Sequence, residues 1–100
     1  MINRLVIMTF RPDCVADFIQ IFDESKDKIR TFPGCCGLKL LQTSDKPHQL
    51  STYSLWESEE ALNAYRHSPL FAETWAKTKA LFSDKPIAFS TAVIRDLNGN

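Results

Sequence analysis

The sequence predicts an α+β fold in which helices cover one face of a four-stranded antiparallel sheet. Two observations support this prediction. Short stretches rich in apolar and β-branched residues alternate with longer amphipathic stretches of helical period. Proline, glycine and small polar residues separate these stretches and mark the turns. The resulting order is β-α-β-β-α(α)-β, which is the ferredoxin-like arrangement.

The first predicted unit is a strand followed by a long helix. Residues 3–10 form an apolar, β-branched stretch whose two faces are both largely apolar. Residues 14–31 place apolar side chains at helical spacing, and Asp13 is a candidate N-cap. Residues 32–34, Phe-Pro-Gly, end this helix in a turn.

Two further strands follow. Residues 36–43 and 49–56 have strand patterns, and the turn-rich segment 44–48 connects them. Because this connection is short, we expect the two strands to be antiparallel neighbours.

The segment from Tyr53 to Phe71 organises the rest of the chain. A strand ends at Trp56, and Ser58 is a good N-cap for a short helix. Ser68 is a second N-cap, followed by a proline at the first helical position. We therefore expect a short helix, a break, and a longer helix that continues to about residue 82.

The chain is expected to close with one more strand. Residues 87–94 have the apolar and β-branched composition of a strand. Residues 95–100 are expected to form a flexible tail, with fraying at 98–100. One domain covering residues 1–100 is the expected organisation.

Composition excludes several classes of partner. The chain has 100 residues, of which 44% are hydrophobic, and its 12 basic and 12 acidic residues give zero net charge. That balance removes the electrostatic basis for binding nucleic acid or an anionic membrane. Three irregularly spaced cysteines are a poor disulfide framework, and no signal peptide or membrane-spanning stretch is evident. We therefore expect a reduced, cytoplasmic protein without nucleic-acid or membrane partners.

The first and last predicted strands have more apolar surface than one layer of helices can cover. Val6, Met8 and Phe10, or else the residues that alternate with them, would remain open to water. A second sheet packed on this face is the simplest cover, which predicts a homodimer.

This pattern resembles the antibiotic biosynthesis monooxygenase (ABM) family over nearly the whole chain. The residues that carry the resemblance are Asn3-Arg4-Leu5, Phe32-Pro33-Gly34, Leu55-Trp56-Glu57-Ser58, Ala61, Tyr65, Ser68 and Phe71. The resemblance implies a dimeric α/β barrel built from two such sheets. It also implies a choice of activities, because the family includes anthrone and quinol monooxygenases, haem-degrading enzymes and members of unknown function.

The haem-degrading branch is tested residue by residue. Its pattern has an asparagine in the first strand, a tryptophan in the short helix and a histidine ligand in the longer helix. Asn3 matches the asparagine, whereas Tyr65 stands in place of the tryptophan and Trp75 in place of the histidine. An indole does not ligate iron as imidazole does, so haem degradation is disfavoured.

The candidate catalytic residues are Asn3, Tyr65 and Trp75. The Asn3 carboxamide would bond a phenolic or enol oxygen of a substrate if it points toward the helices, and the phenol and indole would donate to the same ligand. The alternatives are a solvated asparagine at the strand start and aromatic rings that only pack in the core. Further expected pocket residues are Phe71, Trp56, Leu62 and His67.

No cofactor or metal is expected. The chain has three glycines and no phosphate-cradling loop, and its two histidines do not have metal-ligand spacing. His67 is either a proton acceptor at the pocket mouth or a surface histidine at a helix end.

Three functions remain open at this point. The first is a cofactor-independent monooxygenase that acts on an electron-rich quinol, anthrone or phenol. The second is a dimer that binds a small aromatic ligand without turnover, and the third is an isomerase on the same scaffold.

Overall fold

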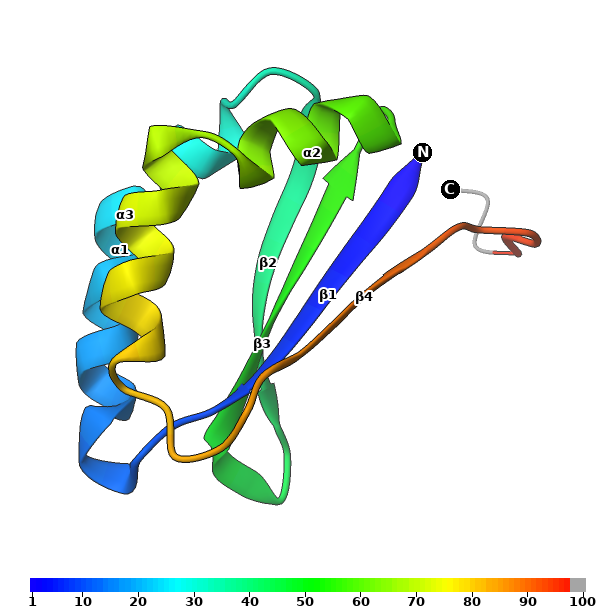
Figure 1. Cartoon of the computed structure of the whole chain (residues 1–100). Coiled ribbons are helices and arrows are strands. Elements are labelled where there is room, and N and C mark those ends of the chain that lie inside the picture. The colour runs from blue at the N-terminus through cyan, green and yellow to red at the C-terminus, as the bar shows by residue number, and fades with distance from the viewer. Residues whose placement is uncertain (98–100) are drawn as a thin grey trace.

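The computed structural model describes residues 1–97 and has all its helices on one face of a single sheet (Figure 1). The strands lie in the order β2-β3-β1-β4, and every neighbouring pair is antiparallel. This arrangement confirms the predicted fold class. The strands are β1 (Ile2–Thr9), β2 (Cys35–Thr43), β3 (Lys46–Trp56) and β4 (Ile87–Thr91). The helices are η1 (Pro12–Cys14, a 3₁₀ turn), α1 (Val15–Arg30), α2 (Glu59–Arg66) and α3 (Pro69–Lys79).

Alternate residues of β1 face opposite sides of the sheet. Met8 and Phe10 face the helices and are 2% and 1% exposed, because they pack with Phe18 of α1 and Leu50 of β3. We call this side of the sheet the helix face. The sequence left open whether Val6, Met8 and Phe10 or the residues that alternate with them face the helices. The structure shows that Val6, Met8 and Phe10 face them and pack in the core on that side.

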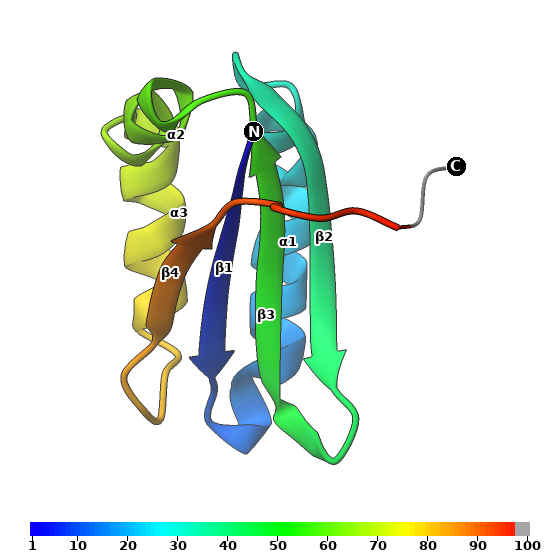
Figure 2. The same cartoon turned by 90° about the vertical axis from the view of Figure 1, so that its right-hand side faces the viewer.

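The opposite side of the sheet, which we call the open face, is shown in Figure 2. Leu5 pairs with Phe89 across β1 and β4, and Ile7 pairs with Ile87. Ile87 and Phe89 are 58% and 41% exposed, and Leu41 of β2 is 45% exposed. No helix packs on this face within residues 1–97 (Figures 1 and 2).

The predicted helix starts of α2 and α3 are confirmed, and the predicted cap of the first helix is wrong. Ser58 and Ser68 each accept a hydrogen bond at 3.1 Å, from the backbone N–H of Ala61 and Phe71. Asp13 caps no helix, because the 3₁₀ turn η1 precedes α1 and the N-cap of α1 is Cys14. The long helix spans Val15–Arg30, so it is one residue shorter at each end than the predicted 14–31.

The turn between β2 and β3 is tighter than the predicted 44–48 segment. β3 already begins at Lys46, because side chains tie the flanking residues together. Gln42 Nε2 donates to the Pro47 carbonyl at 2.9 Å, and Thr43 Oγ1 donates to Gln49 Oε1 at 2.7 Å. At the other end of the chain, β4 stops at Thr91 instead of residue 94.

Gly34 fixes the turn between α1 and β2. Its φ of +87° lies in the left-handed region that favours glycine. A Cβ at this position would also collide with the Cβ of Ala61, because α2 passes directly over the turn. The Gly34 carbonyl accepts a hydrogen bond from the Glu57 N–H at 2.9 Å, which joins this turn to the end of β3.

Two further expectations concern the chain as a whole. Across residues 1–97, no helix has both the length and the apolar character needed to cross a membrane. The expected fraying of residues 98–100 lies outside the described residues. The three cysteines are free thiols.

Candidate functional site

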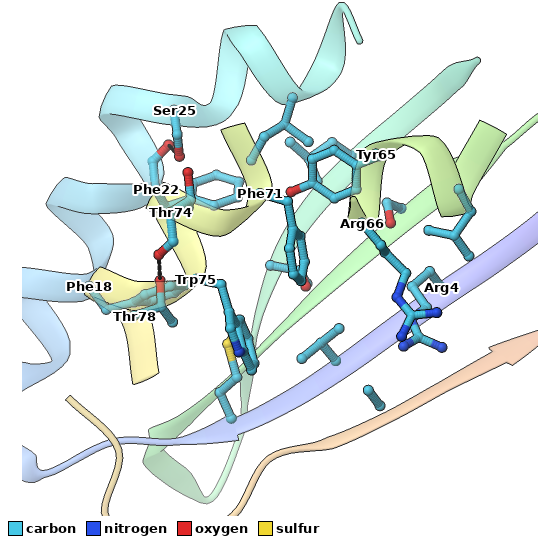
Figure 3. Close-up of a pocket in the computed structure, with 18 residues that line it drawn as sticks. Arg4, Phe18, Phe22, Ser25, Tyr65, Arg66, Phe71, Thr74, Trp75 and Thr78 are labelled. Carbon is cyan, nitrogen blue, oxygen red and sulfur yellow. Dashed lines mark hydrogen bonds between the residues drawn. The ribbon is translucent and has the colours of Figure 1, made fainter. Parts of the chain in front are cut away.

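A cavity of about 330 Å³ lies between the helix face of the sheet and the helices (Figure 3). Its wall is mainly aromatic and aliphatic. β1 contributes Arg4, Val6 and Met8; α1 contributes Phe18, Phe22, Ser25 and Ile29. Leu38, Thr52, Ser54 and Ala88 come from the other strands, and Leu62, Tyr65, Arg66, Phe71, Thr74, Trp75 and Thr78 come from α2 and α3.

Tyr65, Phe71 and Trp75 form one continuous aromatic wall. The Tyr65 and Phe71 rings meet edge to face with centroids 5.3 Å apart, and Phe71 stacks on Trp75 at 5.9 Å. Ser68 fixes this geometry, because its Oγ accepts from the Phe71 N–H and donates to the Tyr65 carbonyl at 2.6 Å. The short helix and the longer helix therefore hold their rings in a defined relation.

Trp56 supports this wall from behind and does not line the cavity. Its ring is 0% exposed and stacks under Tyr65 with centroids 5.0 Å apart. Its Nε1 donates to Ser54 Oγ at 2.9 Å, so the indole has no donor left for a ligand. The prediction that Trp56 is a pocket residue is wrong, whereas Leu62 lies on the cavity wall.

The polar groups of the wall divide into paired and unpaired ones. The Ser25 hydroxyl donates to the Ile21 carbonyl at 2.9 Å, and the Thr78 hydroxyl donates to the Thr74 carbonyl at 2.8 Å. In contrast, the Tyr65 hydroxyl and the Trp75 Nε1 have no hydrogen-bond partner among residues 1–97. Two strong donors on the cavity wall are therefore available to a ligand.

Tyr65 is a proton donor in this environment. Burial raises the pKa of Tyr65 to about 12, with a smaller contribution from Cys35. The phenol therefore stays protonated at neutral pH and can donate its O–H.

Arg4 and Arg66 form a pair of guanidinium groups at one end of the cavity, and our sequence analysis missed their role (Figure 3). Burial lowers the pKa of Arg4, and the nearby charge of Arg66 lowers it further. Arg4 Nη1 donates to Ser90 Oγ at 3.2 Å. A sequence signal existed, because Arg4 has the same strand parity as Val6 and Met8.

Asn3 does not point toward the helices, so the expectation that it joins this cavity is wrong. Strand alternation places it on the open face with Leu5, and it is 8% exposed. Its Oδ1 accepts a hydrogen bond from the Tyr53 hydroxyl at 2.7 Å. This contact gives the buried carboxamide a structural partner.

His67 also lies outside the cavity wall. It is exposed at the end of α2, and its Nδ1 lies 2.7 Å from the Asn63 carbonyl. The expected placement of His67 in the pocket is therefore wrong. The cavity wall contains no aspartate, glutamate or histidine, and residues 1–97 contain no cluster of three such groups or cysteines that would hold a metal ion.

Known proteins share this architecture. Rv0793 from Mycobacterium tuberculosis superposes with a TM-score of 0.87 at 20% identity, covering 96% of this chain and 97% of that chain. SnoaB, a cofactor-independent oxygenase from Streptomyces nogalater, superposes in a mutant form with a TM-score of 0.85 at 18% identity, covering 96% and 95%. At these identities the likeness concerns the fold.

Sequence comparisons add two matches. A curated protein of Natronomonas pharaonis, provisionally named as haem-binding, is 28% identical over 78 residues, which are 78% of this chain and 13% of that protein. The family model described as antibiotic biosynthesis monooxygenase (ABM) matches residues 1–77, which is more than half of the chain. The chain therefore belongs to the antibiotic biosynthesis monooxygenase family.

Proposed function

We propose that this protein is a cofactor-independent monooxygenase that acts on a small electron-rich aromatic compound, such as a quinol, an anthrone or a related phenol. The observation that carries the proposal is the pair of unpaired donors, Tyr65 Oη and Trp75 Nε1, on the wall of a mainly apolar cavity. An aromatic ligand would fill the apolar volume while oxygen atoms on it accept hydrogen bonds from these donors.

The chemistry requires an electron-rich substrate, because the substrate itself supplies the electrons. In the anthrone case, the ring CH₂ becomes a carbonyl: one oxygen atom of O₂ bonds to that carbon, and the other leaves as water with the two hydrogens. The substrate loses four electrons, and both oxygen atoms are fully reduced. Deprotonation of the substrate to an anion makes the first electron transfer to O₂ easier.

The protein would contribute orientation, exclusion of water and stabilisation of that anion. Donors in a poorly solvated site stabilise a developing oxyanion more strongly than water-exposed donors do. Tyr65 remains protonated because burial raises its pKa to about 12. The positive charges of Arg4 and Arg66 would favour the anionic form of a phenol bound close to them.

The lack of a base on the cavity wall favours a second candidate, a binding protein without turnover. No carboxylate or imidazole lines the described cavity to accept the substrate proton. An enzyme of this design depends on substrates acidic enough to lose the proton to water. An isomerase on this scaffold faces the same shortage, because it must move a proton between carbons.

Oxygen consumption separates these functions. Dithranol (1,8-dihydroxy-9-anthrone) and 1,4-naphthohydroquinone are offered to the protein, and autoxidation without protein is subtracted. We expect uptake above autoxidation, a product that gains one oxygen atom, and a loss of about a hundredfold in rate in Tyr65→Phe or Trp75→Phe. Tyr53→Phe is the matched control, because Tyr53 lies on the open face. Ligand binding with uptake at the autoxidation rate would instead indicate a binding protein.

The name of the Natronomonas relative raises haem as a ligand, but the residues of this cavity do not fit it. Haem iron needs an axial ligand, most often an imidazole or a thiolate. No histidine or cysteine lines the described cavity. Trp75 is on the cavity wall, and its indole does not ligate iron as an imidazole does. The raised pKa of Tyr65 also opposes a phenolate ligand.

We further propose that two copies pack through their open faces to form a homodimer. The open face carries the exposed apolar side chains of Leu41, Ile87 and Phe89, and no helix covers them in residues 1–97. Exposed apolar side chains gathered on one face of a sheet are typical of a protein interface. A second identical sheet matches it in shape and chemistry.

A further inference from the structure

We propose that the cavity selects ligands that carry a carboxylate on an apolar ring system, and that Arg4 and Arg66 bind this carboxylate together. The inference rests on the proposed function for the identity of the ring system. It adds a second recognition element, which acts on a permanent negative charge and lies apart from the donors that face the reacting oxygen.

The first support is the juxtaposition of two like charges. Arg4 comes from the start of β1 and Arg66 from the last turn of α2, and Figure 3 shows their guanidinium groups side by side at the same end of the cavity. Their mutual repulsion is one of the two causes that lower the pKa of Arg4. Arg66 is exposed, so water screens part of this repulsion, and an anion bound between the two guanidinium groups would relieve the rest.

The second support is the absence of a protein anion for this pair. Within residues 1–97 the ion pairs are Lys26–Asp23 and Lys77–Glu73, both on exposed helix surface. Arg66 has no hydrogen-bond partner among the described residues, and Arg4 uses one donor on Ser90. Most of the five donors on each guanidinium therefore remain available, in the fork geometry that suits a carboxylate.

The third support is that the cavity has a charged end and an apolar end, which follow one another along β1. Arg4 and Met8 are four residues apart on the same face of β1, so they lie about 13 Å apart along the strand. Met8 packs on Phe18 at the far end. Tyr65 and Trp75 line the cavity between Arg4 and Phe18 (Figure 3). This arrangement fits an elongated molecule with a charged end and an aromatic body.

The test compares a carboxylic acid with its ester. Binding of 2-naphthoate and of methyl 2-naphthoate to the full chain is measured by isothermal titration calorimetry at pH 7, in low and high salt. We expect the acid to bind about tenfold or more tightly than the ester, as charge-assisted hydrogen bonds predict. Added salt should weaken binding of the acid and leave binding of the ester unchanged.

Variants assign the effect to the arginines. Arg66→Gln should weaken binding of 2-naphthoate about tenfold and leave binding of the methyl ester unchanged. The preference for the acid over the ester should then disappear. Arg66→Lys keeps the charge and should restore part of the preference. Lys79→Gln makes the same change of charge on an exposed α3 residue outside the cavity wall and should change neither affinity.

The outcomes separate this inference from the proposed function. If acid and ester bind equally, or if Arg66→Gln weakens both by the same factor, the carboxylate site is wrong while the aromatic site stands. If neither compound binds, and dithranol and 1,4-naphthohydroquinone do not bind either, the cavity is not an aromatic site, and both proposals fail.

Discussion

The two tyrosines of this chain allow a matched test of the site, because their hydroxyls lie on opposite faces of the sheet. The Tyr65 hydroxyl lines the cavity without a partner among residues 1–97. The Tyr53 hydroxyl donates to Asn3 Oδ1 at 2.7 Å on the open face. Replacing either tyrosine by phenylalanine removes one oxygen and keeps the ring, so the two variants differ in what that oxygen does.

For Tyr65→Phe, we expect a loss of binding and almost no loss of stability. A neutral hydrogen bond to a ligand contributes about 1 kcal/mol, so the Kd of a phenolic ligand such as 2-naphthol should rise about fivefold. The ring contacts with Trp56 and Phe71 at 5.0 and 5.3 Å are kept. The free energy of unfolding should therefore change by less than about 0.5 kcal/mol.

For Tyr53→Phe, we expect the reverse. The substitution breaks an existing hydrogen bond and leaves the oxygen of Asn3, which is 8% exposed, without its partner. The cost should be about 1 to 2 kcal/mol in the free energy of unfolding. In a domain of this size, that lowers the Tm by roughly 4 to 15 °C. Affinity for 2-naphthol should not change.

Both variants are measured by calorimetric titration of 2-naphthol and by urea unfolding of the same preparations. The comparison reports on the site only if the two effects separate. A Tyr65→Phe variant that unfolds more easily but binds 2-naphthol like the wild type would show that Tyr65 is structural, and the site assignment would be wrong. Equal binding losses in both variants would refute the assignment as well.

Four further predictions follow from other features. Because the folded-state pKa of Tyr65 is about 12 against an ordinary value of about 10, its stabilisation is present below pH 10 and is lost as the pH rises through 12, with about 2 kcal/mol lost by pH 12; urea unfolding at pH 9 to 12 measures this. Ile87→Lys should convert a dimer to monomers in sedimentation velocity, because it places a charge on the open face. Haem titration should give no stoichiometric Soret complex, because no histidine lines the cavity. Gly34→Ala should destabilise the fold by about 2 kcal/mol or more in urea unfolding, because it combines a positive φ with a collision against Ala61.

Each of these predictions has a control or a contrary outcome. Tyr65→Phe should lack the extra loss of stability between pH 10 and 12. Ile19→Lys changes an apolar α1 residue that is 38% exposed and should leave the oligomer intact; a wild-type chain that sediments as a monomer at micromolar concentration would refute the dimer. A sharp Soret band at one haem per chain would contradict the third prediction. A Gly34→Ala variant as stable as the wild type would contradict the fourth.

Local signals in the sequence predicted most of the fold. Ser58 and Ser68 are N-caps because a serine hydroxyl accepts the unpaired N–H groups of a helix start, and that chemistry is visible in a few residues. Gly34 was found by the same kind of reasoning about turns. The Asp13 prediction failed because the segment after Pro12 forms a 3₁₀ turn, which capping preferences do not distinguish from an α-helix start.

The site was harder to predict, because it depends on which face of a strand meets the helices. β1 is apolar on both faces, so its pattern alone did not decide between the set containing Asn3 and the set containing Arg4. Packing of Met8 on Phe18 decides it, and that contact joins distant parts of the chain. The prediction for Trp56 failed for a related reason. Its indole N–H donates to Ser54 Oγ and its ring stacks under Tyr65, and neither contact is visible in the sequence.

The alternation of β1 has a consequence for how this chain can diverge. Val6 belongs to the cavity wall, and its neighbour Ile7 belongs to the opposite surface. A substitution at Val6 would change the shape of the cavity and leave the open face as it was, whereas one at Ile7 would do the reverse, so the two surfaces can change separately within a single strand. An insertion of one residue in β1 would instead exchange both sets at once. A change in the length of this strand is therefore more disruptive than a change of a single side chain in it.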